Sequence, residues 1–183
     1  LRAFKEPITT SSSKSAFLKV QKKISSIDNF NKGEWWVQDF SSMLPLAINN
    51  KIKNNDILDI CAAPGGKAFQ ILSNNNVVLN DINKKRILKL KENLHRLNYN
   101  PEIKNLNALD FNENIKYDIV LLDSPCSSIG TIRKHPEIFF RSTKPNFISL
   151  NKLQNSLLKK ASKLVKKKRK DNLYGLLIFS FRN

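Results

Sequence analysis

Two short segments of the sequence combine residue types that can do chemistry. The first, Asp59-Ile60-Cys61-Ala62-Ala63-Pro64-Gly65-Gly66-Lys67, supplies a carboxylate, a thiol, two glycines and a lysine directly after an apolar run. Small side chains leave the backbone open, so a strand, a glycine turn and a helix start in this order can hold a nucleotide-like ligand against backbone N–H groups. The pattern Gly-x-x-x-x-Gly-Lys-Ser/Thr is absent, which excludes a Walker A phosphate loop.

An acidic residue follows at the spacing expected of a ribose ligand. Asp81 comes after the next apolar run, Val77-Val78-Leu79, and lies 22 residues beyond Asp59. In dinucleotide-binding folds, an acidic residue about 20 residues after the glycine turn accepts hydrogen bonds from the ribose. We therefore predict that Asp81 binds ribose, and the alternative is that Asp81 caps the helix expected from Asn83 onward.

The second segment, Asp123-Ser124-Pro125-Cys126-Ser127-Ser128-Ile129-Gly130, follows the apolar run 119–122 and pairs a carboxylate with a thiol. Carbon C5 of a pyrimidine is a poor nucleophile until a thiolate adds to C6, and a hydrogen-bond donor or acid near N3 assists that addition. Asp123 and Cys126 are therefore candidates for catalysis on a base. The alternative is a buried structural cysteine beside a carboxylate that caps a turn.

The elements that must position these segments follow from the apolar pattern. Short continuous apolar runs predict strands buried on both faces, at 57–60, 77–79, 119–122 and 176–179. Helical spacing predicts two helices between them, with apolar faces made by Ile87, Leu90, Leu94 and Leu97 and by Leu150, Leu153, Leu157, Ala161 and Leu164. Alternating strands and helices predict a doubly wound, mostly parallel α/β domain whose ligands bind beyond the carboxyl ends of the strands.

The chain of 183 residues fits one domain, which we expect over residues 34–183 after an irregular, polar lead-in over residues 1–33. Asp39 is expected to cap a helix that begins at Phe40. No apolar stretch approaches the roughly 18 to 20 residues of a membrane helix, so no membrane partner is predicted. Two cysteines and two histidines, spaced unlike zinc ligands, predict no metal site and favour a reducing cytoplasm.

The charge of the chain favours a polyanionic partner. Thirty-two Lys and Arg residues against 15 Asp and Glu residues give a formal net charge of +17, which favours nucleic acid. A biased composition rich in Lys, Asn and Ile is the alternative origin of this charge. No aromatic-rich RNA platform is visible in the sequence, so we expect any RNA binding to depend mainly on phosphate contacts.

The two segments, extended by Thr131-Ile132-Arg133-Lys134-His135-Pro136-Glu137, resemble the RsmB/Sun family of RNA cytosine-5 methyltransferases over roughly residues 33–180. The resemblance implies a Rossmann-like class I methyltransferase fold, S-adenosylmethionine as cofactor and RNA, ribosomal RNA first, as partner. It implies that residues 61–67 surround the cofactor, that Asp81 binds its ribose, and that Asp110 lies near its adenine. It also implies that Asp123 lies between the methyl donor and the base.

The sequence departs from this family at one catalytic position. The family uses a Pro-Cys cysteine, which Cys126 matches, and a Thr-Cys cysteine that attacks C6, where Phe181 and Arg182 stand here. The family's later strands are also absent, so we expect a domain truncated after its fifth strand, from a truncated or frameshifted gene. Three alternatives remain open: attack by Cys126, an inactive module that binds S-adenosylmethionine or RNA, and a DNA methyltransferase, which this chain favours least.

Overall fold

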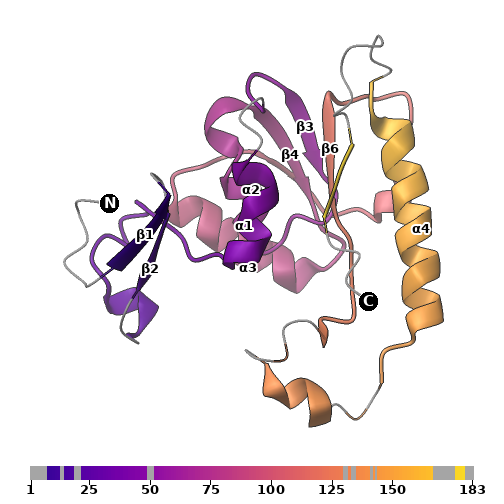
Figure 1. The fold of residues 1–183 in the computed structure, drawn as a ribbon. Coiled ribbons are helices and arrows are strands. Elements are labelled where there is room, and N and C mark those ends of the chain that lie inside the picture. Colours follow the sequence, from indigo (N-terminus) through magenta and orange to yellow (C-terminus); the bar gives the residue numbers. More distant parts are fainter. Residues whose placement is uncertain are drawn as a thin grey trace.

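A parallel sheet of five strands, in the order β5-β4-β3-β6-β7, forms the centre of the computed structural model (Figure 1). The strands are β3 (Asp56–Asp59), β4 (Asn76–Asn80), β5 (Glu102–Lys104), β6 (Ile119–Asp123) and β7 (Leu176–Phe179). All four neighbouring pairs run parallel. The structure describes residues 8–12, 15–18, 22–48, 52–129, 132, 135–140, 142, 144–166 and 176–179.

Helices cover both faces of this sheet because side chains alternate along each strand. One face contributes Ile57, Leu79 and Leu121 to a core shared with α1 (Phe40–Ala47), α2 (Gly66–Phe69) and α3 (Lys84–Arg96). The other face contributes Leu58, Val78 and Val120 to a core shared with η3 (Ala108–Asp110) and α4 (Phe147–Leu164). The prediction of a doubly wound α/β fold is confirmed.

One helix begins at its predicted cap, and the structure shows two caps that were not predicted. Asp39 accepts a hydrogen bond from the Ser41 backbone N–H at 2.9 Å and starts α1, as predicted. Asn83 caps α3, and Asn146 caps α4 in the same way. Three further short 3₁₀ helices lie in the described part of the chain: η1 (Ile24–Ser26), η2 (Leu72–Asn74) and η5 (Pro136–Phe140).

The buried face of α4 differs from the predicted one at two positions. Leu153 is 38% exposed, whereas the neighbouring Gln154 is 3% exposed. Leu157, Ala161 and Leu164 are buried as the spacing predicts. Gln154 is buried in place of Leu153 because its side-chain amide donates to a backbone carbonyl of the candidate site.

The described part of residues 1–33 is more regular than the expected irregular lead-in. Strands β1 (Ile8–Ser12) and β2 (Ser15–Leu18) pair antiparallel as a small separate sheet. The following turns are attached to α3, because the Arg96 guanidinium donates to the backbone carbonyls of Phe30 (2.7 Å) and Trp35 (2.9 Å). The Ser/Thr-rich composition of this region concealed the hairpin, because β1 carries only one apolar residue.

The strand order places the reversal of the sheet between β3 and β6. From β3 the chain moves outward to β4 and then β5, and β6 returns to pair with the opposite edge of β3. In open α/β sheets, ligands bind in the crevice at this reversal, beyond the carboxyl ends of the strands. Within the described part of the chain, no helix has the length and apolar composition needed to cross a membrane.

Candidate functional site

Three aspartates end three neighbouring strands and meet at the carboxyl edge of the sheet. Asp59 ends β3, Asp81 follows β4, and Asp123 ends β6. Asp59 and Asp81 are each 2% exposed, and the side chain of Asp123 is 36% exposed. The sequence placed the three carboxylates at strand ends, and the strand order brings these ends together.

The glycine loop between β3 and α2 takes its shape from close internal packing. Gly65 has a φ of +114°, and a Cβ atom added there would lie 2.1 Å from the ring of Phe69 and 2.9 Å from Leu90. An added Cβ at Gly66 would meet the Gln38 side chain at an ordinary 3.5 Å. The need for glycine at position 65 therefore arises from the left-handed turn and from the Phe69 ring, which is the second of the two reasons expected for glycine here, a close ligand or a sharp turn.

Two side chains of α3 hold the same loop from outside. The Asn93 amide donates to the Pro64 carbonyl at 3.2 Å, and the Arg86 guanidinium donates to the Ala63 carbonyl. Arg86 also pairs with a carboxylate oxygen of Asp81 at 3.3 Å. Neither residue was singled out in the sequence, because an Arg and an Asn on a helix have no recognisable spacing from the loop they contact.

Asp81 faces the glycine loop and does not cap α3, so the alternative role considered for this residue is wrong. Its Oδ2 accepts from the Ala63 backbone N–H at 3.3 Å, and its Oδ1 accepts from the Asn83 backbone N–H at 2.9 Å. The cap of α3 is Asn83, which accepts from the backbone N–H of Arg86. A carboxylate oxygen has two lone pairs, so Oδ1 can accept a second hydrogen bond from a ligand hydroxyl.

Two asparagines tie the strand ends together. The buried Asn80 amide donates to the carbonyls of Ile60 (3.0 Å) and Leu106 (3.1 Å), and its oxygen accepts from the Leu106 backbone N–H. Asn105 donates to the carbonyls of Asp81 (2.7 Å) and Ile82 (3.0 Å). These contacts link β3, β4 and the segment after β5, and they position Asp81 through its backbone. A polar residue inside an apolar run was the only sequence signal for Asn80.

Lys67 and Asp123 form the ion pair across the reversal of the sheet. The Lys67 Nζ lies 2.5 Å from Asp123 Oδ2, and the Lys67 side chain is 13% exposed. Lys67 belongs to the glycine loop and Asp123 to the Pro-Cys loop, so the pair joins the two segments identified in the sequence. The sequence predicted that both segments lie at one edge but not that these two side chains touch.

Asp59, the remaining aspartate of this edge, has a perturbed pKa. Burial, followed by the charge of the nearby Asp123 carboxylate, raises the pKa of Asp59 to about 7. A hydrogen bond from the Cys61 backbone N–H and the charge of Lys67 oppose this shift. The edge therefore holds more negative charge than its described cations fully compensate.

The Pro-Cys loop is held against α4. The Gln154 amide donates to the Pro125 carbonyl at 2.9 Å, which explains the polar residue on the buried face of that helix. Cys126 is half-buried, with its Sγ 4.0 Å from the hydroxyl oxygen of Ser128, and Ser128 has a φ of +61°. The thiol is thus presented on a tight turn one strand away from the glycine loop.

The two cysteines differ in environment. Cys61 packs beside the core between the sheet and α4, and burial, followed by the charge of Asp59, raises the pKa of its thiol to about 12. A thiol held neutral is a poor nucleophile. Cys61 therefore contributes its backbone and its volume to the loop, and Cys126 remains the candidate for thiol chemistry among the described residues.

Only some of the remaining predicted residues lie in the described part of the chain. Asp110 is exposed in η3, the first helical turn after β5. Phe181 and Arg182, at the family's Thr-Cys position, lie outside the described residues, as do Arg133 and Lys134. Among the described residues, no group of His, Cys, Asp and Glu side chains has the arrangement of a metal site.

The family described as "16S rRNA methyltransferase RsmB/F" matches residues 46–180 of the chain. Ribosomal RNA small subunit methyltransferase B of Photorhabdus laumondii is 38% identical over 141 residues, which cover 74% of this chain and 33% of that protein. The same enzyme of Proteus mirabilis is 35% identical over 138 residues, with coverages of 72% and 33%. The chain thus spans about a third of the length of these curated relatives.

Two solved structures from Pyrococcus horikoshii share the fold. NSun6 with SFG superimposes with a TM-score of 0.69 at 27% identity, covering 80% of this chain and 39% of that one. A methyltransferase homolog protein gives a TM-score of 0.71 at 25% identity, with coverages of 90% and 54%. Because the family matches most of the chain, including both loops of the candidate site, the chain belongs to the 16S rRNA methyltransferase RsmB/F family.

Proposed function

We propose that this chain carries the cofactor site and the base site of an enzyme that transfers a methyl group from S-adenosylmethionine to C5 of cytosine in RNA, with ribosomal RNA as the first candidate. The observation that carries the proposal is the Lys67–Asp123 pair at the reversal of the sheet, with Cys126 in the same loop as Asp123. The cytoplasm, a reducing compartment, suits a chain whose two cysteines are free thiols.

The donor set at the carboxyl edge fits S-adenosylmethionine, which carries positive charge on its sulfur and its amino group. Asp59, Asp81 and Asp123 present carboxylates from three strand ends, and residues 61–67 present backbone. Asp81 Oδ1 is the acceptor for a ribose hydroxyl, and Asp110 is assigned to the adenine end. The relative with SFG, an analogue of S-adenosylmethionine, supports the same class of ligand. When bound, the cofactor supplies an electrophilic methyl group.

Apolar side chains beside Asp81 fit a flat aromatic ring. Ile82 is 66% exposed, Leu106 is 46% exposed and Leu109 is 36% exposed, and all three follow the carboxyl ends of β4 and β5. Exposed leucine and isoleucine side chains at the end of a buried sheet gain free energy when a ring covers them. We assign this surface to the adenine of the cofactor.

The Lys67–Asp123 pair matches the polar edge of cytosine. A carboxylate accepts from the exocyclic N4 amino group of cytosine, and an ammonium group donates to N3 or O2. Because Lys67 fixes the orientation of the Asp123 carboxylate at 2.5 Å, both groups are prepared before the base arrives. Their role is to hold the base and to assist the gain of electron density at N3 when a thiolate adds to C6.

The identity of the attacking thiol separates two forms of the proposal. A thiolate must add to C6 before C5 can attack the methyl carbon and displace S-adenosylhomocysteine, and Arg182, in place of the family's cysteine, cannot form the bond to C6. Either Cys126 makes the attack or the chain binds cofactor and RNA without turnover. The substitution at position 182 favours the second form.

Methyl transfer from labelled S-adenosylmethionine into cytosine-containing RNA tests the proposal. We expect the unmodified chain to show a rate several orders of magnitude below an enzyme with both cysteines, because loss of a covalent nucleophile costs that much. The double substitution Phe181→Thr with Arg182→Cys should raise the rate. Turnover by the unmodified chain that Cys126→Ala abolishes would instead assign the attack to Cys126. Failure to bind S-adenosylmethionine in calorimetry would refute the proposal.

A further inference from the structure

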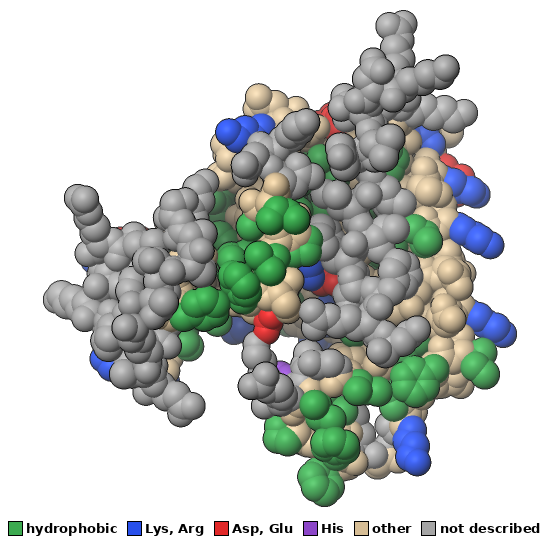
Figure 2. All heavy atoms as spheres, in the orientation of Figure 1, with side chains coloured by type: hydrophobic (Ala, Val, Ile, Leu, Met, Phe, Trp, Pro, Cys, Tyr) green, Lys and Arg blue, Asp and Glu red, His purple; other side chains and the backbone are tan. Residues whose placement is uncertain are grey.

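The solvent side of α4 carries a row of lysines without acidic neighbours in the helix. The 18 residues of α4 include no Asp or Glu. Lys152, Lys159 and Lys163 are separated by seven and four residues, a spacing that places them on one side of a helix, away from the buried face. Figure 2 shows Lys and Arg side chains following one another along α4, at the right of the view.

Two lysines of this row have no compensating charge in the described part of the chain. Lys163 shares Glu113 with Lys160, at 3.4 and 3.0 Å. Lys152 and Lys159, and Lys144 just before the helix, form no ion pair with a described acidic residue. Their exposed ammonium groups therefore produce a positive potential along the lower part of α4.

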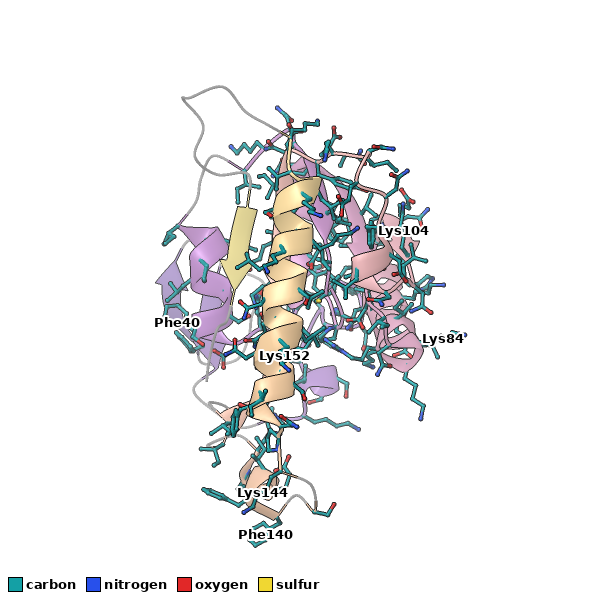
Figure 3. All side chains as sticks on the ribbon, turned by 90° about the vertical axis from the view of Figure 1, so that its right-hand side faces the viewer. Phe40, Lys84, Lys104, Phe140, Lys144 and Lys152 are labelled. Atoms are coloured by element: carbon teal, nitrogen blue, oxygen red, sulfur yellow. The ribbon has the colours of Figure 1, made fainter. Side chains whose placement is uncertain are left out.

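Exposed phenylalanines stand next to these lysines. Phe139 is 76% exposed and Phe140 is 88% exposed in η5, the turn that precedes α4. Figure 3 shows Phe140 and Lys144 together at the end of the arm below α4, with Lys152 higher on the helix. The sequence analysis expected no aromatic platform for RNA, because two adjacent phenylalanines in a short turn resemble core residues until their exposure is known.

We propose that these five residues form a binding surface for single-stranded RNA, here called the α4–η5 surface: Lys144, Lys152 and Lys159 contact phosphates, and Phe139 and Phe140 stack on unpaired bases. A positive track beside exposed aromatic rings is the arrangement that binds single strands without sequence preference. A duplex offers phosphates but no free base faces, so a single strand satisfies both parts of the surface.

The surface is connected to the candidate site by the same helix. Gln154 on the buried face of α4 donates to the Pro125 carbonyl, so the helix that carries the lysines on its solvent side is held against the loop of Cys126 by its other side. The inference rests on the proposed function for its choice of RNA as substrate. It adds a contact region outside the strand ends, one that holds RNA flanking the target cytosine.

The lysines are tested by titrating a labelled single-stranded RNA of about 12 nucleotides at several salt concentrations. The variant Lys144→Gln, Lys152→Gln, Lys159→Gln should lower the affinity about tenfold at low salt and reduce the slope of log affinity against log salt by about 2, since each phosphate contact contributes about 0.7. The control Lys32→Gln, Lys53→Gln, Lys91→Gln makes the same change in net charge at exposed sites elsewhere. Equal losses in both variants would refute a specific surface.

The phenylalanines are tested separately, because stacking does not depend on salt. Phe139→Ala with Phe140→Ala should weaken binding about tenfold and leave the salt slope unchanged. Val37→Ala with Ile48→Ala, which removes exposed apolar side chains from another face, should have no effect. Unchanged RNA affinity in the phenylalanine variant would overturn the stacking role, and so would equally tight binding of a duplex.

Two further measurements distinguish RNA binding by this surface from a protein contact and from an effect on the cofactor site. Light scattering that shows self-association of the chain, lost in the phenylalanine variant, would assign the apolar part to a protein contact and contradict the inference. Calorimetry with S-adenosylmethionine should give the same affinity for every variant, because none touches the strand ends. RNA binding through the surface without cofactor binding would refute the proposed function alone. Cofactor binding together with RNA binding that the surface variants do not weaken would refute the surface alone.

Discussion

The carboxyl groups at the two ends of strand β3 have pKa values shifted in opposite directions, because their surroundings at the two edges of the sheet differ. Asp56 begins the strand and Asp59 ends it. A hydrogen bond from Asn76, followed by one from Lys166, holds the pKa of Asp56 below its ordinary value. Burial, followed by repulsion from Asp123, raises the pKa of Asp59 to about 7. Asp56, whose charge is stabilised by its partners, and Asp59, whose charge is disfavoured by burial, are therefore only three residues apart on one strand.

The amino edge of the sheet is arranged for stability. Lys166 lies 3.1 Å from Asp56 and 3.0 Å from Asp118, so one cation pairs with two strand starts. Burial works to raise the pKa of Asp118, yet the backbone N–H of Asp56 and the Lys166 ammonium hold it below its ordinary value. The hydrogen bonds to both carboxylates raise the pKa of Lys166. Each charge at this edge has a partner within the chain.

The carboxyl edge, which we propose as the ligand site, is arranged differently. The strand order holds its three aspartates close together. Lys67 pairs with Asp123, and Arg86 pairs with Asp81 and also donates to the Ala63 carbonyl of the glycine loop. Crowded, partly uncompensated carboxylates cost stability and are found where a site binds or reacts. The contrast predicts that substitutions at the two edges act on different properties.

The largest contrast is expected between Gly65 and Asn54, two residues with left-handed backbone that lie at opposite edges of the sheet. Gly65→Ala at the carboxyl edge should lower the free energy of unfolding by about 4 kcal/mol, since backbone strain and overpacking against Phe69 add. Asn54→Ala at the amino edge, with a φ of 57°, should cost only about 1 kcal/mol. Urea unfolding of both variants measures this, and similar losses would show that the glycine loop is not unusually constrained.

The next effect concerns pH. Because the pKa of Asp59 in the folded state, about 7, lies above the unfolded value near 4, the native protein holds this proton more tightly, and stability falls as the pH rises from about 4 to about 7. Asp59→Asn keeps the acceptor for the Cys61 N–H. It should flatten this dependence and raise the free energy of unfolding at pH 8 by about 2 kcal/mol. Urea unfolding at pH 5 and pH 8 checks this, and an undiminished pH slope in the variant would contradict it.

Ligand binding should respond only at the carboxyl edge. Asp81→Asn should weaken S-adenosylmethionine binding about tenfold, because a charged hydrogen bond to the ribose and the pairing with Arg86 are both reduced. Asp118→Asn makes the same chemical change at the amino edge and should leave the affinity unchanged. Calorimetry on the two variants decides the matter. A loss in both would mean that the aspartates act through overall charge.

The smallest effect is expected at the amino edge. Lys166→Gln should lower the unfolding midpoint slightly, because the ion pairs of a partly exposed lysine are weakened by solvent. Thermal unfolding in low salt and in about 0.5 M salt measures this, since added salt should remove the difference between variant and parent. A loss as large as that of Gly65→Ala would show that the amino edge stabilises the fold far more than its exposure suggests.

Much of the fold was predictable because continuous apolar runs mark strands that are buried on both faces. The strand β5 was missed because its three residues, Glu102–Lys104, include a single apolar side chain, and only pairing with β4 defines it. The hairpin in residues 8–18 was missed for a similar reason, since its Ser and Thr residues are also typical of turns. Strands defined by pairing alone leave little pattern in the sequence.

The candidate site was predictable to the level of its loops. The residues at strand ends were identified because motif and strand position coincide at Asp59, Asp81 and Asp123. The contacts among them were not, because Lys67 and Asp123 are 56 residues apart and meet only through the strand order. Asn80 and Gln154 were missed because a buried polar residue has a purpose only in relation to the backbone groups that it reaches in three dimensions.

Amide hydrogen exchange with and without S-adenosylmethionine tests most directly whether the carboxyl edge is the ligand site. We predict slower exchange on addition of the cofactor at residues 60–68, 81–83 and 123–127, and no change at 54–56, 74–76 and 116–118 on the amino edge. Asp81→Asn should reduce the protection in the first set at a fixed cofactor concentration. Protection confined to the amino edge, or absent at saturating cofactor, would contradict the account.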